Sequence, residues 1–384
     1  MENLISKKNI FIWSPMISHV GTLRAAIGMA QSLTKYGSAN IYLINVFGEF
    51  DNYKNSQDFK LLSIFNKISF YKTGIISKFL IYTFTIFSIP SLIFYILKYK
   101  PKIIITCLVG YVPTMLKFFF KNLIVINSIQ GYPKLTTLRR FLWKNIYLKS
   151  DALITMTNIT KIKLQKEFAF QSSRIIKIDN PIISRKIRQM ANEDIEKEDL
   201  KLFEKKVFCS IGRLTRQKNY LELLKAFDVF SKICKEKVNL IIIGEGEDKP
   251  ILEQFIKKNN IQNCFLLGFK KNPYKYLSKS NLYISSSLWE EPGHTIIESG
   301  YLNVPVLSSD CPNGPREIII DNTNGFKYPT NNIVEFANKL REIENIDKKK
   351  LHLIKYNMKK TISNFTEFKF YSKFCNYYDF FSNK

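Results

Sequence analysis

Apolar residues are grouped along this chain in short blocks, and polar stretches with helical spacing separate many of these blocks. The blocks are rich in Ile, Val and other strand formers, and runs of this kind are typical of strands buried on both faces of a parallel sheet. The first series covers residues 9–13, 40–46, 67–71, 102–108, 122–127, 152–156 and 174–178. The second series covers residues 206–211, 238–243, 263–267, 281–286 and 304–308. The pattern predicts two α/β sheets in tandem.

The boundary between the two series is a polar, charge-dense stretch that begins near residue 185. Such composition is typical of a linker between domains. We therefore predict a first domain over residues 1–185, a linker over 186–205 and a second domain over 206–364. The last stretch, 365–384, is rich in aromatic residues and predicts a helix that packs against a domain.

One segment raises the question of a membrane. Residues 79–97 carry no charge over 19 positions and are flanked by Lys78 and Lys98, which approaches the ~20 residues of a spanning helix. A full span would separate the strands before it from the strands after it, so that the first sheet could not form. We expect no full span. A helix in the membrane interface and a helix buried in the domain both remain open.

Charge is distributed unevenly between the two halves. Residues 1–190 carry 27 Lys and Arg against 7 Asp and Glu, a net charge of +20, whereas residues 191–384 carry 31 against 25, a net charge of +6. A basic field attracts nucleic acid or an anionic membrane surface, although compositional drift toward Lys is an alternative source of the excess. The basic residues are dispersed and no nucleic-acid module is recognisable. We expect an anionic membrane surface as a partner and no nucleic acid.

Metal chemistry has little support in the sequence. The six cysteines stand singly, and the three histidines have no metal-binding spacing. We predict no metal site and no cofactor.

The candidate chemistry begins after the strand that ends near residue 286. Glu290 and Glu298 stand eight residues apart, with Gly293 and His294 between them. A turn followed by a helix that begins near residue 295 would direct backbone N–H groups at a phosphate. Glu298, on the first turns of that helix, is suited to accept hydrogen bonds from a ribose diol.

Cations for a phosphate are available in the loop after the strand at 206–211. Arg213 and Lys218 follow Gly212 in this loop, so both side chains can reach one diphosphate. Cations there would stabilise the negative charge that develops on a departing nucleoside diphosphate. Each motif alone is also compatible with a solvated loop and a capped helix, but their order on successive βα units favours a site.

These motifs resemble those of the retaining glycosyltransferases of family 4. The similarity lies in segments 210–219 (SIGRLTRQKN), 242–247 (IIGEGE), 267–269 (LGF), 290–298 and 303–310 (NVPVLSSD), with a looser match at 20–24 (VGTLR), 149–157 (KSDALITMT) and 180–182 (NPI). The resemblance implies an α/β GT-B fold, in which two Rossmann-like domains face a central cleft and the last helix crosses back to the first domain. It also implies transfer with retention of configuration and without a metal.

The resemblance assigns roles to individual residues. It implies that Arg213 and Lys218 hold the donor diphosphate, that Glu290 meets the donor sugar and that Glu298 holds the ribose. Gly293 and His294 would present backbone amides. Gly21 would allow the first domain's loop to approach the donor diphosphate closely, for which a residue without Cβ is suited.

Two positions depart from the family pattern. The family often has Phe at the position of His294, and it often has His where this chain has Gln130 at the end of a first-domain strand. Glutamine donates a hydrogen bond but does not take up a proton near neutral pH. Gln130 is therefore expected on the acceptor side without a protonic role.

The motifs and the resemblance together imply a retaining, hexosyltransferase-type glycosyltransferase that moves a hexose or N-acetylhexosamine from a UDP- or GDP-sugar to a lipid-linked or envelope polysaccharide acceptor. We expect a cytoplasmic enzyme, peripheral on the inner face of the cell membrane. The alternatives are an enzyme of the same fold that acts on a small soluble acceptor, and a protein that binds a sugar nucleotide without transfer. The nucleotide base, the sugar and the linkage are left open.

Overall fold

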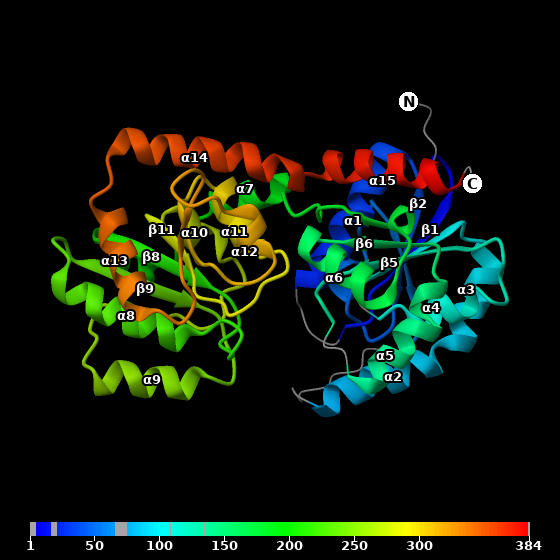
Figure 1. The fold of residues 1–384 in the computed structure, drawn as a ribbon, viewed down its shortest axis with the longest axis horizontal. Coiled ribbons are helices and arrows are strands. Elements are labelled where there is room, and N and C mark those ends of the chain that lie inside the picture. Colours follow the sequence, from blue (N-terminus) through cyan, green and yellow to red (C-terminus); the bar gives the residue numbers. More distant parts are fainter. Residues whose placement is uncertain (1–4, 17–20, 66–74, 108, 134–135, 383–384) are drawn as a thin grey trace. The chain divides into compact units, whose positions relative to one another are not determined.

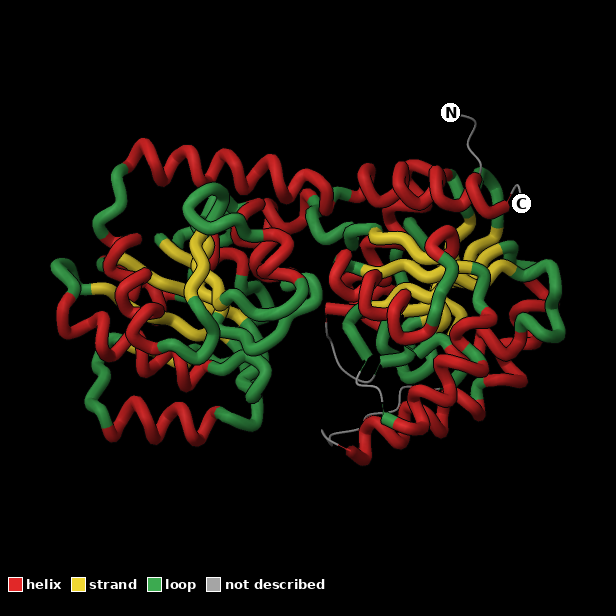
Figure 2. The backbone as a smooth tube through the Cα atoms, viewed as in Figure 1, coloured by secondary structure: helices red, strands yellow, loops and turns green. Residues whose placement is uncertain are grey.

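Two compact units make up the chain in the computed structural model, which describes residues 5–16, 21–65, 75–107, 109–133 and 136–382. The first unit contains residues 1–182 and 365–384, and the second contains residues 183–364. Each unit has one parallel sheet with helices on both faces (Figures 1 and 2). The prediction of two Rossmann-like α/β domains is confirmed, whereas the cleft between them concerns their relative placement and stays a prediction.

The sheet of unit 1 has the described strand order β3-β2-β1-β4-β5-β6-β7, and every pair is parallel. Its strands are β1 (Asn9–Trp13), β2 (Asn40–Asn45), β3 (Lys60–Ser63), β4 (Ile103–Cys107), β5 (Ile124–Ile129), β6 (Ala152–Thr155) and β7 (Ile175–Lys177). The sequence pattern missed β3, and the strand predicted at 67–71 lies outside the described residues. The helices are α1 (Gly21–Gly37), α2 (Ile75–Phe87), α3 (Ile89–Tyr99), α4 (Tyr111–Leu116), α5 (Thr137–Asn145), α6 (Asn158–Phe168) and α15 (Glu367–Ser382).

Alternation along β1 explains why both faces of this sheet are apolar. Ile10 and Ile12 belong to the core cluster that includes α1 and α15. Phe11 and Trp13 belong to the cluster on the other face, to which α2, α3, α4 and α5 contribute. Successive strand residues point to opposite faces, so a continuous apolar run is what a sheet covered on both sides requires.

The C-terminal helix α15 packs against α1 in unit 1. The Ser32 hydroxyl donates to the Glu367 carbonyl at 2.6 Å, and Lys35 forms an ion pair with the Glu367 carboxylate at 3.0 Å. Phe370 and Phe374 are buried in the same core cluster. The aromatic residues of the last stretch thus serve the core of a unit that begins more than 300 residues earlier.

The uncharged segment 79–97 forms parts of two helices rather than one. Ser88 and Pro90 lie where α2 ends and α3 begins, and the two helix axes differ by 47°. In the part of the chain that the structure describes, no single helix has the length and hydropathy to span a membrane, although Leu80–Phe87 and Ile89–Tyr99 meet that criterion as a bent pair. The segment is partly core, since Leu92 and Ile96 are buried, and partly surface, since Phe87 and Phe94 are exposed.

The sheet of unit 2 has the described order β10-β9-β8-β11-β12-β13, again with parallel pairs. Its strands are β8 (Lys206–Ile211), β9 (Val238–Ile243), β10 (Cys264–Leu266), β11 (Leu282–Ser285), β12 (Val306–Ser309) and β13 (Phe326–Tyr328). The helices are α7 (Arg185–Ala191), α8 (Tyr220–Ile233), α9 (Lys249–Lys258), α10 (Tyr274–Ser278), α11 (His294–Tyr301), α12 (Gly314–Ile318), α13 (Ile333–Glu344) and α14 (Lys348–Ile362). The sequence pattern missed β13.

The predicted linker at 186–205 is instead an ordered part of unit 2. It contains α7 and a 3₁₀ helix, η4 (Lys197–Glu204). The single proton of the buried Tyr276 hydroxyl is shared between the carboxylates of Asp199, 2.6 Å away, and Glu196, and Lys270 pairs with Asp199 at 2.7 Å. The charged residues that suggested a solvated linker are therefore partners of side chains on and beside α10.

This anchoring predicts that Tyr276→Phe destabilises unit 2 by about 1–3 kcal/mol, because two carboxylates lose a buried donor. We expect faster limited proteolysis within residues 193–205, measured by mass spectrometry of the first fragments. Tyr356→Phe removes a hydroxyl from an exposed tyrosine of the same unit and serves as the control. Equal cleavage rates in both variants would show that the Tyr276 hydroxyl does not hold this segment.

Candidate functional site

The predicted donor residues lie where the strand order of unit 2 reverses. From β8 the chain continues to β9 on one side, and β11 pairs with β8 on the other. In open α/β sheets the loops at the carboxyl ends of two such strands diverge and leave room for a ligand. Gly212, Arg213 and Lys218 follow β8, while Glu290 and Gly293 follow β11.

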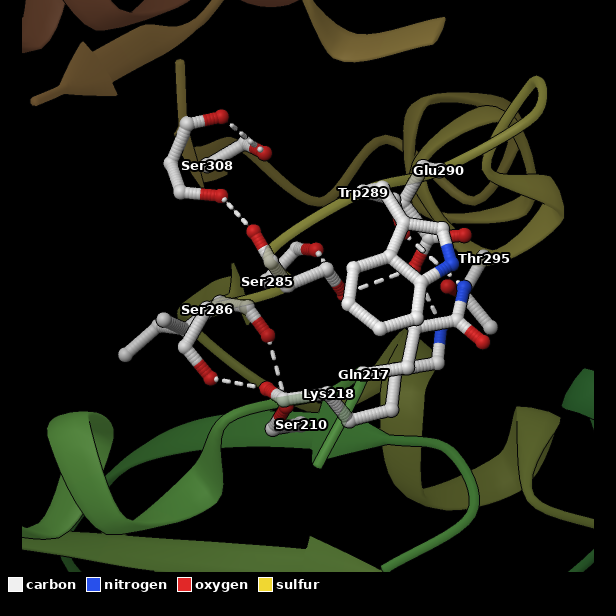
Figure 3. Close-up of polar contacts among 12 residues, drawn as sticks. Ser210, Gln217, Lys218, Ser285, Ser286, Trp289, Glu290, Thr295 and Ser308 are labelled. Atoms are coloured by element: carbon white, nitrogen blue, oxygen red, sulfur yellow. Dashed lines mark hydrogen bonds and ion pairs between the residues drawn. The ribbon is translucent and has the colours of Figure 1, made fainter. Parts of the chain in front are cut away.

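Hydrogen bonds hold these two loops together (Figure 3). The Leu288 amide donates to the Gln217 carbonyl at 2.8 Å, and the Gln217 side chain donates to the Trp289 carbonyl at 2.9 Å. The Ser286 hydroxyl donates to the Lys218 carbonyl at 2.7 Å. In each of these hydrogen bonds, a donor from one loop meets a backbone carbonyl of the other loop. Together they fix the relative position of the two loops.

Lys218 and Glu290 form an ion pair at the centre of this arrangement. Their side chains are only 18% and 9% exposed, and the Ser287 hydroxyl donates to the same Glu290 oxygen at 2.6 Å. Ser287 is itself held through its carbonyl, which accepts from the Ser309 hydroxyl at 2.5 Å. A largely buried carboxylate is stable here because it has both a counter-charge and a hydroxyl donor.

Gly212 makes room for the lysine. A Cβ at this position would lie 3.0 Å from Lys218 Cε and 2.9 Å from the Tyr220 hydroxyl. Burial raises the pKa of the Tyr220 hydroxyl well above its ordinary value, so this neighbour stays uncharged. Gly212 therefore leaves free the space that the Lys218 side chain occupies at the end of β8.

Helix α11 begins at His294, next to the predicted position 295. Gly293 precedes it with φ of 97°, a left-handed conformation that favours glycine. The Tyr283 hydroxyl on β11 donates to Thr295 at 2.5 Å and ties the first turn of the helix to the sheet. Backbone amides at a helix start are suited to an anion, and their use for this by Gly293 and His294 stays a prediction.

Glu298 is less accessible than a carboxylate on a helix surface. It is buried, and the Tyr274 hydroxyl donates to its Oε1 atom at 3.0 Å. The structure therefore holds Glu298 in a fixed orientation on α11. Its role in holding a ribose stays a prediction.

Arg213 differs from Lys218 in its surroundings. Its side chain is exposed, and among the described residues it takes part in no hydrogen bond or ion pair. The structure thus brings Lys218 to Glu290 but leaves the Arg213 guanidinium in solvent at the same loop. It is a cation that a ligand can recruit without breaking an internal contact.

The two remaining site residues belong to unit 1. Gln130 follows β5, donates to the Ser128 hydroxyl at 2.7 Å and accepts from the buried Asn180 amide at 2.8 Å. Gly21 is the first residue of α1, and the four residues before it lie outside the described part of the chain. Gln130 is thus part of a fixed amide network, which agrees with a hydrogen-bonding position rather than a protonic one.

Sequence reasoning missed the serines that support the site. Ser285, Ser286 and Ser287 follow one another at the end of a buried strand, and Ser309 ends the neighbouring strand. A run of small hydroxyl residues between an apolar strand and a glutamate was the signal available. Cys311 lies in the same region, and burial raises the pKa of its thiol to about 12, which favours the protonated thiol at neutral pH.

No three His, Cys, Asp or Glu side chains gather as a possible metal site within the described residues. The charged groups nearest to one another in the candidate site are one ammonium and one carboxylate. These observations do not test whether the reaction needs a metal, so the expectation of a metal-independent reaction stays a prediction.

One known protein family matches the region of the chain that contains this site. Residues 192–360 match the family model of the glycosyl transferases group 1. This part of the chain contains Arg213, Lys218, Glu290 and Glu298, so the site lies in the domain that carries the family's pattern.

Two curated relatives agree with this match. Over 185 residues the chain is 40% identical to the uncharacterized glycosyltransferase MJ1059 of Methanocaldococcus jannaschii. The aligned region covers 47% of this chain and 45% of the relative. Over 194 residues it is 30% identical to N-acetylgalactosamine-N,N'-diacetylbacillosaminyl-diphospho-undecaprenol 4-alpha-N-acetylgalactosaminyltransferase of Campylobacter jejuni, half of each chain. The chain thus spans about half the length of these relatives.

The fold is shared over nearly the whole chain. The crystal structure of Anabaena Alr3699/HepE in complex with UDP and glucose superimposes with a TM-score of 0.74, 15% sequence identity, and coverage of 96% of this chain and 98% of that one. At this identity the similarity shows the fold alone. The protein has the GT-B fold, built from two Rossmann-like units.

The buried Lys218–Glu290 pair predicts strong coupling between its members. Lys218→Met should cost about 3 kcal/mol of unfolding free energy, because Glu290 would be left buried without a counter-charge. Adding Glu290→Gln should restore part of this loss, with a coupling energy of about 1 kcal/mol or more. Urea unfolding followed by circular dichroism measures all four forms.

The exposed pair Lys206–Glu236 is the matched control, since its side chains are 40% and 60% exposed in the same unit. Its coupling energy should stay below about 0.5 kcal/mol. If the changes in unfolding free energy at Lys218 and Glu290 are additive, the two side chains are not coupled, and the ion pair is not the main support of the site.

Proposed function

We propose that this protein is a retaining glycosyltransferase that moves a hexose or N-acetylhexosamine from a UDP- or GDP-sugar to a lipid-linked or polysaccharide acceptor. The observation that carries the proposal is the Lys218–Glu290 pair at the carboxyl ends of β8 and β11, inside the region that matches the family model. Family 4 is the group whose motifs the chain resembles.

The proposed donor site uses two cations with different tasks. The Lys218 ammonium has three N–H donors, so it can hold Glu290 and a phosphate oxygen at once. Arg213, exposed in the same loop, can add a planar guanidinium to the diphosphate. Together they would stabilise the negative charge that develops as the nucleoside diphosphate departs, and the proposed reaction needs no metal.

The remaining donor contacts follow from the helix start. The amides of Gly293 and His294 would bind phosphate or sugar oxygens, and Glu290 would accept from sugar hydroxyls. Glu298 would accept from the ribose diol. The relative from Campylobacter jejuni is named for a diphospho-undecaprenol substrate and the Anabaena structure contains UDP, which supports a UDP-sugar and a lipid-linked acceptor for this chain.

The acceptor would be met by unit 1, with Gln130 as a hydrogen-bonding residue near it. Gly21 would belong to the donor side, where the lack of a Cβ allows close approach to the diphosphate. We infer that the protein works at the inner face of the cell membrane as a peripheral enzyme. The net charge of +20 on residues 1–190 supports this inference.

Nucleotide binding predicts a stabilisation of the protein by UDP or GDP. At 100 times its dissociation constant, a ligand of the native state stabilises by about 2.7 kcal/mol, which appears as a rise in melting temperature. Glu298→Gln should reduce the rise for UDP and GDP while leaving the melting temperature of the free protein nearly unchanged. A screen in which neither nucleotide raises the melting temperature would contradict the proposed donor class.

Transfer predicts unequal effects of two neighbouring arginines. Arg213→Ala should lower kcat about 10- to 1000-fold, because charge on the leaving diphosphate loses a partner. Arg216→Ala removes another exposed guanidinium three positions along the same loop and should change kcat less than twofold. Release of UDP or GDP from labelled donor measures both. Equal losses would mean that the general charge of the loop, rather than Arg213, is what matters.

A further inference from the structure

Unit 1 has large apolar side chains in solvent on the outer sides of four helical segments. Those exposed by more than half of their area are Ile86 and Phe87 on α2, Phe94 and Leu97 on α3, Phe118 and Phe119 just after α4, and Phe141 on α5. Single exposed apolar residues are ordinary on any protein surface. Seven of them on consecutive elements of one unit indicate a surface that contacts a partner. We call it the α2–α5 surface.

These elements form one layer. Their buried sides share a single core cluster, which contains Ile96 of α3, Leu116 of α4 and Trp143 of α5. The Tyr111 hydroxyl on α4 donates to the Tyr82 carbonyl on α2 at 2.8 Å, and the two rings stack. Figure 1 shows α2, α3, α4 and α5 next to one another along one side of the unit. Because the layer is anchored from below, its exposed phenylalanines are not needed for the core.

Charge identifies the kind of partner. Between Asp58 and Asp151 the sequence contains no Asp or Glu but 14 Lys and Arg. On α3, Lys98 lies over the Phe94 ring with its ammonium 5.6 Å from the ring centre, and Lys121 in the turn before β5 and Lys144 on α5 are exposed. A protein partner or a second copy would need acidic residues to meet these cations. An anionic bilayer offers negative headgroups for the lysines and acyl chains for the aromatic rings.

We propose that the α2–α5 surface docks on an anionic lipid bilayer, with its phenylalanines inserted at the headgroup boundary and its lysines on the headgroups. The docking deepens the proposed function, because it would hold unit 1 where a lipid-linked acceptor is found. It rests on that function only for the identity of the acceptor, since vesicle binding needs no donor and no turnover.

The apolar contribution is tested with the full chain by co-sedimentation with vesicles of phosphatidylglycerol and of phosphatidylcholine. Phe87→Ser with Phe119→Ser removes side chains that are 67% and 81% exposed and should weaken binding to phosphatidylglycerol at least about tenfold. The matched control is Phe269→Ser with Val334→Ser in unit 2, at positions 75% and 67% exposed, and it should bind like the unaltered protein.

The charge contribution is tested by substituting exposed lysines, which are not needed for folding. Lys98→Gln, Lys121→Gln and Lys144→Gln together should weaken binding about 100-fold at low salt, from about 1 kcal/mol for each cation near an anionic surface. Lys257→Gln, Lys258→Gln and Lys271→Gln in unit 2 are the control. Binding of the unaltered protein should fall as salt rises, because the headgroup field is screened.

Several outcomes would overturn the docking. They are equal binding to both lipids at all salt concentrations, binding that neither unit 1 variant weakens, and weakening that the unit 2 controls share. Dimers on gel filtration that Phe87→Ser with Phe119→Ser disperses, without vesicle binding, would instead make this surface an interface between two copies. The rise in melting temperature with UDP or GDP is measured on every variant, so a failure of the donor site is recognised separately from a failure of docking.

Discussion

The candidate site depends on an ion pair that joins two loops from distant parts of the sequence. Lys218 and Glu290 are largely removed from water, and an ionised group in such surroundings is tolerated only beside its partner. The pair therefore requires that the loops after β8 and β11 keep their relative position. The serine and glutamine hydrogen bonds between them meet this requirement.

Close backbone contacts make the arrangement possible. A Cβ on Gly244 would lie 1.9 Å from the Gly212 carbonyl oxygen, and a Cβ on Gly314 would lie 1.7 Å from the Pro292 carbonyl oxygen. A side chain at Gly244 would displace the loop after β8, which holds Lys218, and a side chain at Gly314 would displace the loop after β11, which holds Glu290. These two glycines thus act on the site through packing.

The two faces of the sheet in unit 1 have different relations to solvent. One face is closed by α1 and by α15, which arrives from the end of the chain and buries Phe370 and Phe374. The other face is closed by α2 to α5, whose outer sides carry aromatic residues and lysines. The unit thus has one side completed within the chain and another that offers apolar and basic groups to a partner.

Most strands could be predicted from the sequence because a strand buried on both faces is a continuous apolar run. The edge strands β3 and β13 were missed, since KLLS and FKY are short and contain polar residues that an edge tolerates. The stretch 186–205 was assigned as a linker because its charges suggested solvent. Its partners Lys270 and Tyr276 lie about 70 to 80 residues away, and no local pattern reveals them.

The sequence by itself determined the two α/β units, the loops that carry Arg213, Lys218, Glu290 and Glu298, and the uneven charge of the two halves, since periodicity and residue chemistry are local properties. Only the tertiary structure decided that Lys218 pairs with Glu290, that Arg213 stays in solvent, that Glu298 is buried against Tyr274, and that segment 79–97 is divided between core and surface. These outcomes depend on which strands are neighbours and which helices cover them. Burial and pairing are therefore set by chain topology, which brings together residues that the sequence keeps far apart.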